Sequence, residues 1–437
     1  MDDRMLIAPE TLLADVYAGR SGVYHGRVTK KYDHKKVCLL QLLCCGQRLK
    51  AVIRKGTTAN YELIRDAVSL GSAVCGIGRL TLDPKNETEI EFAELYLVRE
   101  DLHKGNGSGL VSGSKFTKND MKRYFHTYLC DSELCAMNIA ARGAVFSGLR
   151  HGLEERGYIE CTTPMLTRNF YGGGAQPFIT HMLDNGADMY LRVSAEIAMK
   201  HIIGGGFDRV YEIGPSFRNG SVSAKYATPF YGAEIYTAYC TEQDNIDTAI
   251  ALMRCIEISL DRKLEKFGAE KKISFLGDIP SVSFGEYYLR KTGECFDPRL
   301  LAVDCEDRSQ NSREIYKQLK SELIADQISP ILITDLPAGS SPLIAEKSES
   351  TLRRSYLVAN GATISECAIG SSDPRELCRQ FGLQDGEQNE RYKRDHEPFL
   401  HLYESGMPPV GSIFIGVDRI VPAFLGIDNI NDYLMSM

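Results

Sequence analysis

The chain has 437 residues, 43 % of them hydrophobic and 25 % charged, which is typical of a globular protein with two or three domains. Its net charge of −7 argues against a protein that coats nucleic acid through bulk charge, although a local basic face is compatible with it. No apolar run approaches the roughly 18 residues of a membrane span, and the acidic start lacks a signal pattern, so we expect a cytoplasmic protein with no membrane partner. The 13 cysteines include no C-x-x-C pair, which favours reduced thiols over a zinc ribbon.

Residues 1–102 are predicted to form a first domain, which is rich in strand patterns. Strands are expected at 23–28, 37–43, 49–54, 72–78 and 89–97, with a helix at 61–70 between the third and the fourth. This order is that of an OB-fold barrel, and a generic small β-barrel is the alternative. Basic and aromatic side chains here are candidates for contacts to phosphates and bases: Lys30, Lys31, Lys35, Lys36, Arg48, Lys50 and Arg54, with Tyr24, Tyr32 and Phe92. A solvated hairpin tip accounts for the lysine pairs as well as an RNA site does.

Residues 103–120 are rich in Gly and Ser and predict a linker, so the second domain is placed at 121–437. A long helical pattern from 138 to 156 ends at Gly157, and a strand at 158–161 and Pro164 follow it. Next comes a glycine-rich loop at 172–174, where the backbone can approach a ligand closely, and then the segment 193–200. Further helices are expected at 244–264 and 312–324, without a functional prediction for residues 241–330.

The segment from Phe217 to Tyr239 predicts a β-hairpin with a long loop. Alternating residues precede it at 209–214, Gly220 and its neighbours supply turn chemistry, and Phe230 opens the second strand. An arginine fixed on a strand, Arg218, can grip phosphate oxygens with its forked donors, and the Phe230 ring can stack on a base. For these residues taken alone, an ordinary hairpin with a surface arginine is the alternative.

The last third of the chain contains three further segments of interest, at 330–337, 354–374 and 411–424. The last of them holds Gly416-Val417-Asp418-Arg419. A lone Gly-x-Asp-Arg segment is weak evidence for a ligand site. Here it follows Arg218 in the chain, with Pro408-Pro409 before it.

These segments resemble the class II aminoacyl-tRNA synthetases, and most of all the lysyl-tRNA synthetases of that class (subclass IIb). The hairpin resembles motif 2, and it keeps without a gap Phe217, Arg218, Asn219, Ser223, Phe230, Glu234, Tyr236, Ala238 and Tyr239. Residues 138–164 resemble motif 1, which builds the dimer interface in the family, and 411–424 resemble motif 3. The resemblance implies an α+β fold: an N-terminal OB-fold barrel that holds a tRNA anticodon, then a catalytic domain with an antiparallel sheet flanked by helices. It also implies a homodimer.

The same resemblance implies amino-acid activation by ATP, with transfer to tRNA. Catalytic roles fall on Arg218, between substrate carboxylate and α-phosphate, and on Arg419, at the γ-phosphate. ATP-binding positions are Arg218, Lys225, Tyr226, Phe230, Gly416 and Arg419, and amino-acid-binding positions are Gly174, Glu196, Glu234, Tyr236, Glu366 and Gly370.

Several positions depart from the family pattern. Gly220 and Tyr226 replace Glu and His, Gln176 replaces Arg, and Ser412 and Phe414 replace glycines; Met199 stands where aspartyl enzymes carry Lys, which argues against aspartate. In the ungapped alignment of 354–374, the two Mg²⁺ carboxylates fall on Tyr356 and Thr363, so we assign no metal ligand, and any Mg²⁺ would be held by phosphates and water or by other carboxylates. The Glu that pairs the lysine ε-ammonium falls on Gly370, and an Asn falls on Glu366. A rival register puts Glu366 at the lysine-pairing position but loses the match at Asp373-Pro374.

Three functions follow from this mixture. The first is a synthetase with altered amino-acid specificity, the second an adenylating enzyme with a non-tRNA acceptor, and the third a non-catalytic paralogue that binds an amino acid, a nucleotide or RNA. The barrel favours the first, and the lost carboxylates favour the third. Gly370 cannot pair an ε-ammonium, whereas Glu366 suggests a cationic or hydrogen-bond-donating ligand side chain.

Overall fold

The computed structural model describes residues 21–44, 46–83, 88–99, 132–169, 175–220, 223–224, 226–296, 322–338, 343–348, 350–375, 377, 390–430 and 433. The chain divides into two compact units, Met1–Ala140 with Met435–Met437, and Ala141–Leu434. The predicted linker at 103–120 lies outside the described residues. No helix in the described part of the chain combines the length and the apolar character needed to cross a membrane.

The first unit contains a closed five-stranded barrel, as predicted. Its strands are β1 (Ser21–His34), β2 (Val37–Cys44), β3 (Gln47–Arg54), β4 (Ala73–Leu82) and β5 (Thr88–Arg99), and they close in the order β1-β2-β3-β5-β4. The short helix α2 (Tyr61–Ala67) lies between β3 and β4 in the chain, so the element order is that of an OB-fold. Alternating apolar residues of all five strands fill the interior.

Two of the three aromatic candidates for base stacking are misassigned. Tyr24 and Phe92 are 5 % and 0 % exposed, and their rings meet edge to face at 6.3 Å inside the barrel, because the strand alternation turns both inward. Tyr32 is 56 % exposed. The basic character is also reduced, since Lys50 pairs with Asp83 at 3.1 Å and Arg54 with Glu89 at 3.3 Å. The exposed cations that remain near Tyr32 are Lys30, Lys35 and Lys36.

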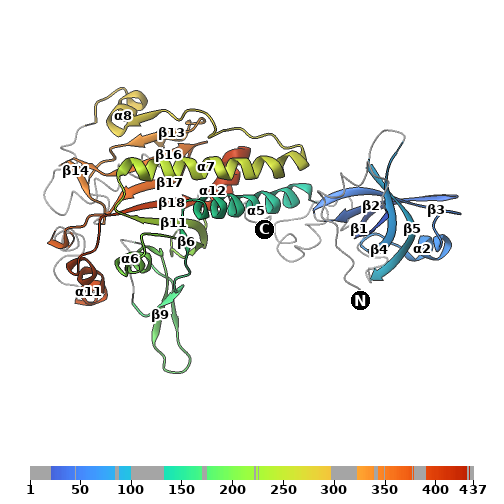
Figure 1. Cartoon of the computed structure of the whole chain (residues 1–437), viewed down its shortest axis with the longest axis horizontal. Helices are drawn as coiled ribbons and strands as arrows, with labels where there is room; N and C mark the ends of the chain where they lie inside the picture. The colour runs from blue at the N-terminus through green and yellow to red at the C-terminus, as the bar shows by residue number, and fades with distance from the viewer. Residues whose placement is uncertain are drawn as a thin grey trace. The chain divides into compact units, whose positions relative to one another are not determined.

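The second unit is built on an eight-stranded sheet (Figure 1). Its strand order is β12 (Ser281–Ser283), β13 (Ile331–Thr334), β16 (Arg354–Ala359), β17 (Ala362–Ile369), β18 (Val410–Gly416), β11 (Phe230–Ala238), β10 (Arg209–Ser216) and β6 (Ile159–Glu160). Neighbours from β13 to β10 are antiparallel, and only the two edge pairs are parallel. The predicted antiparallel sheet flanked by helices is therefore confirmed.

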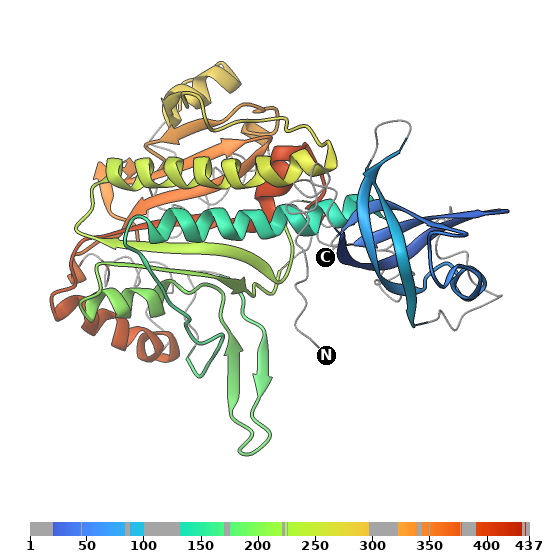
Figure 2. The same ribbon diagram turned by 45° about the vertical axis from the view of Figure 1, so that its right-hand side comes forward.

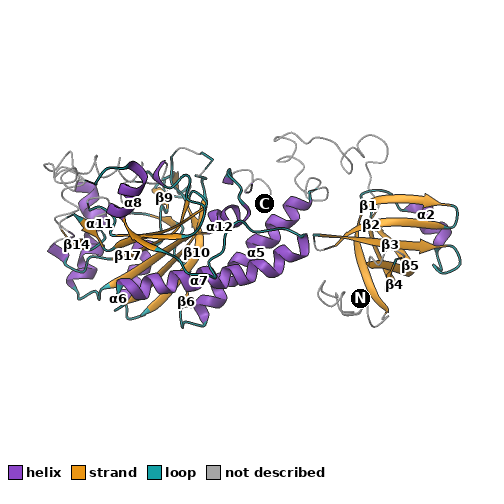
Figure 3. Ribbon diagram, turned by 90° about the horizontal axis from the view of Figure 1, so that it is seen from above, coloured by secondary structure: helices purple, strands orange, loops and turns teal. Residues whose placement is uncertain are grey.

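Two long helices cover one face of this sheet. The helices α5 (Glu133–Glu154) and α7 (Glu242–Leu264) lie side by side across the strands (Figures 2 and 3). They approach closely because Gly148 has no side chain: a Cβ there would lie 2.7 Å from the Cα of Ile256. The Asn245 amide of α7 donates to the carbonyls of Ala368 and Ser412 at 3.0 and 2.9 Å, which ties the helix to β17 and β18. Ligands must therefore reach the opposite face.

Smaller elements complete the second unit. They are β7 (Leu166–Thr167), β8 (Ile179–His181), β9 (Asp188–Leu191), α6 (Glu196–Gly204), η2 (Glu265–Phe267), α8 (Phe284–Thr292), β14 (Glu346–Ser348), β15 (Thr351–Leu352), α11 (Glu390–Glu404) and α12 (Val417–Leu425). Most of the helix predicted at 312–324 lies outside the described residues. The predicted helices at 138–156 and 244–264 are α5 and α7, which begin five and two residues earlier.

Candidate active site

Strand register brings the candidate residues onto one face. Glu212, Glu234, Phe414, Glu366 and Tyr356 are successive cross-strand partners on β10, β11, β18, β17 and β16. Directly opposed residues of antiparallel strands share a face, so these five side chains form a row across the sheet. Two parallel rows flank it, one with Gly214, Gly232 and Gly416 and one with Tyr236, Ser412, Ala368 and Arg354. The missing side chains of these glycines leave space that neighbouring groups fill: the Arg192 guanidinium lies over Gly214 and the Phe414 ring over Gly232.

The two predicted catalytic arginines lie on this side of the sheet. Arg218 follows β10, its Nε donates to the Val193 carbonyl at 3.2 Å, and its guanidinium lies 5.2 Å from the centre of the Phe230 ring. Arg419 lies in the first turn of α12 and donates to the Thr363 carbonyl at 2.9 Å. Among the described residues, neither guanidinium forms an ion pair with a carboxylate. Burial, together with the positive charge of Arg218, lowers the pKa of Arg419, so an anion between the two would be stabilised.

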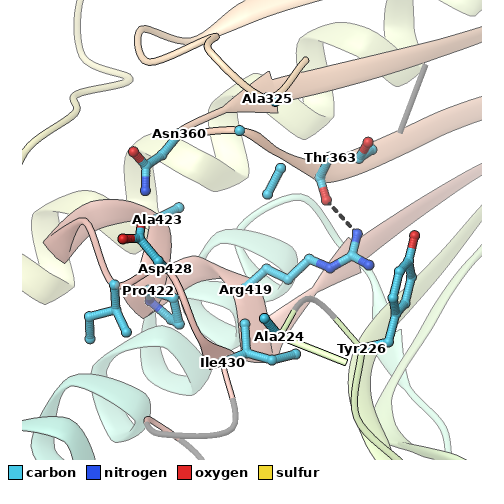
Figure 4. A pocket seen from close by; sticks show the side chains of 13 residues that line it. Ala224, Tyr226, Ala325, Asn360, Thr363, Arg419, Pro422, Ala423, Asp428 and Ile430 are labelled. Atoms are coloured by element: carbon cyan, nitrogen blue, oxygen red, sulfur yellow. Dashed lines mark hydrogen bonds between the residues drawn. The ribbon is translucent and has the colours of Figure 1, made fainter. Parts of the chain in front are cut away.

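A cavity of about 150 Å³ opens beside Arg419. In Figure 4 the guanidinium lies between the Thr363 carbonyl and the Tyr226 ring, whose centre is 5.4 Å away. The remaining lining comes mainly from the turn between β16 and β17 and from α12 and the residues after it, including Asn360, Pro422 and Asp428. A cation and an aromatic ring at the mouth of a small cavity suit a phosphate or a nucleotide group.

The buried carboxylate of Glu234 lies at the other end of the site. It accepts hydrogen bonds from the Ser194 hydroxyl at 2.9 Å, the Ala195 amide at 3.0 Å and the Tyr236 hydroxyl at 2.8 Å. Burial raises the pKa of Glu234, and burial beside that carboxylate raises the pKa of Tyr236 well above its usual value. A carboxylate whose charge is costly in this place is a natural partner for an ammonium group.

Two further carboxylates at this end already have cationic partners. Glu196 pairs with the buried ammonium of Lys200 at 2.8 Å, one turn along α6. Burial alone would lower the pKa of Lys200, but the Glu196 carboxylate raises it overall. Glu366 pairs with Arg354 at 2.5 Å. A Cβ on Gly370 would lie 3.7 Å from the Lys200 nitrogen, so this ammonium lies beside the position assigned to the lysine-pairing Glu.

Two buried ion pairs support the site from outside it. Asp418 accepts from Arg142 of α5 at 2.5 Å and from the Tyr231 amide at 2.7 Å, which fixes the start of α12 against β11. The Arg192 guanidinium pairs with Glu212 at 2.6 Å and lies over Gly214, where a Cβ would come within 2.6 Å of it. The pairing of these residues follows only from the fold.

The residues present do not fit the pair of Mg²⁺ carboxylates that the resemblance implies. The Tyr356 ring is buried among Phe284, Ile333 and Val358, and Arg354 lies 5.2 Å from its centre. At the second position, Thr363 offers a hydroxyl in place of a carboxylate. Within the described ranges, no three His, Cys, Asp or Glu side chains come together as a metal site would require.

The fold brings together ten of the twelve predicted site residues. Tyr226 and Arg419 line the cavity, and Arg218, Phe230 and Gly416 lie beside them. The end of the site around Glu234, called the carboxylate end below, holds Glu196, Glu234, Tyr236, Glu366 and Gly370. The other two, Gly174 and Lys225, lie outside the described residues. Two residues were missed as site residues, Lys200 and Phe414. Phe414 gave a signal, because it stands where the family pattern has glycine.

Comparison with known proteins agrees with this geometry. The family model for tRNA synthetases class II (D, K and N) matches residues 120–435. A lysine–tRNA ligase of Fervidobacterium nodosum is 27 % identical over 434 residues, covering 94 % of this chain and 82 % of its own length. Those of Thermosipho africanus and Methanospirillum hungatei are 27 % and 25 % identical over 436 and 438 residues, each covering 94 % of this chain and 84 % of its own length.

Members of this family are ATP-dependent ligases that use Mg²⁺ and bind an amino acid, ATP and, through an OB-fold domain, tRNA. The barrel, the antiparallel sheet and the two arginines at its motif 2 and motif 3 positions are all present here. The chain therefore belongs to the class II aminoacyl-tRNA synthetases of the D, K and N group, as a divergent relative of the lysyl-tRNA synthetases.

Proposed function

We propose that the protein activates an amino acid with ATP to form an aminoacyl-adenylate, and then transfers the aminoacyl group to tRNA. In the first step a carboxylate oxygen attacks the α-phosphorus, the bond between the α-phosphorus and the bridging oxygen breaks, and pyrophosphate leaves. The reaction needs two anions brought together and negative charge stabilised on phosphorus, with little covalent help from the protein.

The observation that carries this proposal is the pair Arg218 and Arg419. Both are held by backbone carbonyls on one side of the sheet, each beside an aromatic ring, and among the described residues neither has a carboxylate partner. Two guanidinium groups that repel each other in this way favour a polyanion such as a triphosphate. Glu234 supplies a negative charge for the α-ammonium of the amino acid at the opposite end.

Phe230 is placed to stack on adenine. We propose an altered amino-acid specificity relative to lysine, because the carboxylates near Gly370 are neutralised within the chain. Any Mg²⁺ would be bound by the nucleotide phosphates and water, or by carboxylates other than those at the family's two positions.

The barrel supports tRNA as the acceptor through Tyr32 and the lysines beside it. The burial of Tyr24 and Phe92 favours a second candidate, in which the acceptor is a small molecule, a peptide or a protein. The residues Tyr356 and Thr363 favour a third, a non-catalytic paralogue that only binds ligands. A homodimer through β6 and α5 is proposed by analogy with the family.

The deciding experiment is amino-acid-dependent exchange of pyrophosphate into ATP, with the standard amino acids and with and without Mg²⁺. We expect exchange with a limited set of amino acids, reduced about 100-fold or more in Arg218→Ala. Arg290→Ala, which removes an exposed arginine of α8, is the matched control and should retain full activity. Absence of exchange with every amino acid, from folded protein, would overturn the enzymatic proposal.

The acceptor needs its own assay. Incubation with labelled amino acid, ATP and total tRNA should give label that resists protein digestion and is released from RNA by mild base. Label that moves instead to a small molecule or a peptide would select the second candidate.

A further inference from the structure

The carboxylate end of the site contains more negative than positive side chains. Three carboxylates face this region, Glu196, Glu234 and Glu366, and two cations, Lys200 and Arg354, are ion-paired with the first and the last of them. Lys200 is fully enclosed, with its side chain 2 % exposed and its nitrogen 5.6 Å from the Phe399 ring centre. The chain itself therefore neutralises two of the three negative charges.

Glu234 is the carboxylate that is left for a ligand. Its three donors are neutral, a hydroxyl from Ser194, an amide from Ala195 and a phenol from Tyr236, and no Lys or Arg within the described ranges pairs with it. A carboxylate has about four acceptor sites, so these donors leave space for one more hydrogen bond. The Glu234 carboxylate can therefore balance one ammonium group, and the α-ammonium of an amino acid would occupy that place.

At this end of the site an aromatic ring fills part of the space above the strands. Phe414 is the cross-strand partner of both Glu234 and Glu366, so it stands between them. Its ring leans over Gly232, because a Cβ on that glycine would lie 2.3 Å from the Phe414 Cε2 atom. The ring also meets Phe230 edge to face, with centres 6.3 Å apart. A long ligand side chain crossing this row would collide with the ring.

We propose that the site selects an α-amino acid with a short, uncharged side chain. A second ammonium, as in lysine or ornithine, would meet Lys200 near Gly370 and would find no carboxylate without an internal partner. An acidic side chain would add charge to a region that is already negative by one unit. This inference rests on the proposed function, since it names the substrate class of the same site.

The test is a panel in two assays, pyrophosphate exchange and thermal stabilisation of the ATP-loaded protein. Glycine, alanine and serine are compared with lysine, ornithine, glutamate and phenylalanine. We expect exchange and stabilisation only with the short neutral group. Exchange that is fastest with lysine or ornithine would overturn the inference and leave the proposed function standing. Stabilisation by short neutral amino acids without exchange would support the inference and reject the proposed function. Stabilisation by none of the panel, without exchange, would overturn both.

Two variants test the two causes separately. Lys200→Met keeps the volume of the side chain but frees Glu196, so ornithine or diaminobutyrate should gain at least about 100-fold relative to alanine in kcat/KM or in binding. Phe414→Gly should instead extend the range to longer neutral side chains, by about 10- to 100-fold. Lys291→Met is the matched control: it removes a lysine of α8 that pairs with Asp326 at the surface, and it should not change the amino-acid preference. An unchanged preference in both folded variants would refute the assignment.

Discussion

The position of the Phe414 ring can be tested through its contact with Gly232. An alanine at 232 would place its Cβ 2.3 Å from one ring atom of Phe414 and 2.7 Å from the next. Carbon atoms in contact stay about 3.5–4.0 Å apart, so the ring would have to move by more than about 1 Å. Gly232→Ala should therefore destabilise the protein by about 1–3 kcal/mol, the usual cost of overpacking.

Removing the ring should reverse the sign of this effect. In the Phe414→Gly background the added methyl group meets no ring, and alanine in a strand interior is favoured over glycine by about 0.5–1 kcal/mol. The two substitutions should then show a coupling energy of about 1.5–4 kcal/mol, combining the overpacking cost and the gain over glycine.

Urea unfolding of the four proteins of this double-mutant cycle, followed by circular dichroism, measures the coupling. Gly285→Ala is the control, because a Cβ at Gly285 would have no neighbour within 4 Å. This substitution should change the free energy of unfolding by the same amount in the wild-type and the Phe414→Gly proteins. Additivity of Gly232→Ala and Phe414→Gly to within about 0.5 kcal/mol would show that the ring does not lie over Gly232. The size limit proposed for the site would then lose its basis.

Three further outcomes are expected. Glu212→Ala leaves the Arg192 guanidinium buried without its carboxylate, so urea unfolding should show a loss of about 3–5 kcal/mol, against about 0–1 kcal/mol for Lys291→Ala at the surface; equal losses would contradict the assignment. If the barrel binds tRNA, Tyr32→Ala should weaken tRNA affinity by about 1–3 kcal/mol in filter binding. Lys35→Ala should reduce the slope of log affinity against log salt concentration by about one. Wild-type affinity and slope in these variants would show that this part of the barrel does not bind tRNA. Because burial raises the pKa of Glu234 in the folded state, its protonation stabilises the fold at low pH, and this stability is lost as pH rises through the folded-state pKa; Glu234→Gln should flatten that decline in urea unfolding above the ordinary pKa of a glutamate, about 4.3, and identical pH profiles would refute it.

Much of the fold could be predicted from local patterns. The strand runs between 22 and 97 and the hairpin from 209 to 239 carry alternation and turn residues that specify strands directly. Their sequence spacing also fixed the barrel order, since one helix interrupts five strands. The error over Tyr24 and Phe92 has a physical reason: an aromatic residue in an alternating strand suits the core and the binding surface equally, and only barrel closure decides between them.

The charge state of the site could not be predicted in the same way. The sequence places Glu366 in the site as a carboxylate, but it does not show that Arg354, twelve residues earlier on the neighbouring strand, neutralises it. Likewise Lys200 is one turn from Glu196 on a helix, a spacing that usually describes an exposed pair, whereas here the ammonium is buried beside Gly370. Pairing across strands and burial depend on the whole fold.

The departures from the family pattern are coupled by position. In the ungapped alignment, Tyr356 stands where the family has a metal-binding carboxylate, and Glu366 stands where the family has an asparagine. These two residues are direct cross-strand partners. Arg354 pairs with Glu366 and also lies against the Tyr356 ring. Restoring Glu at 356 alone would set two carboxylates opposite each other, which is unfavourable. Any Mg²⁺-dependent gain of activity should therefore require Tyr356→Glu together with Glu366→Asn, and the single change should only destabilise the sheet.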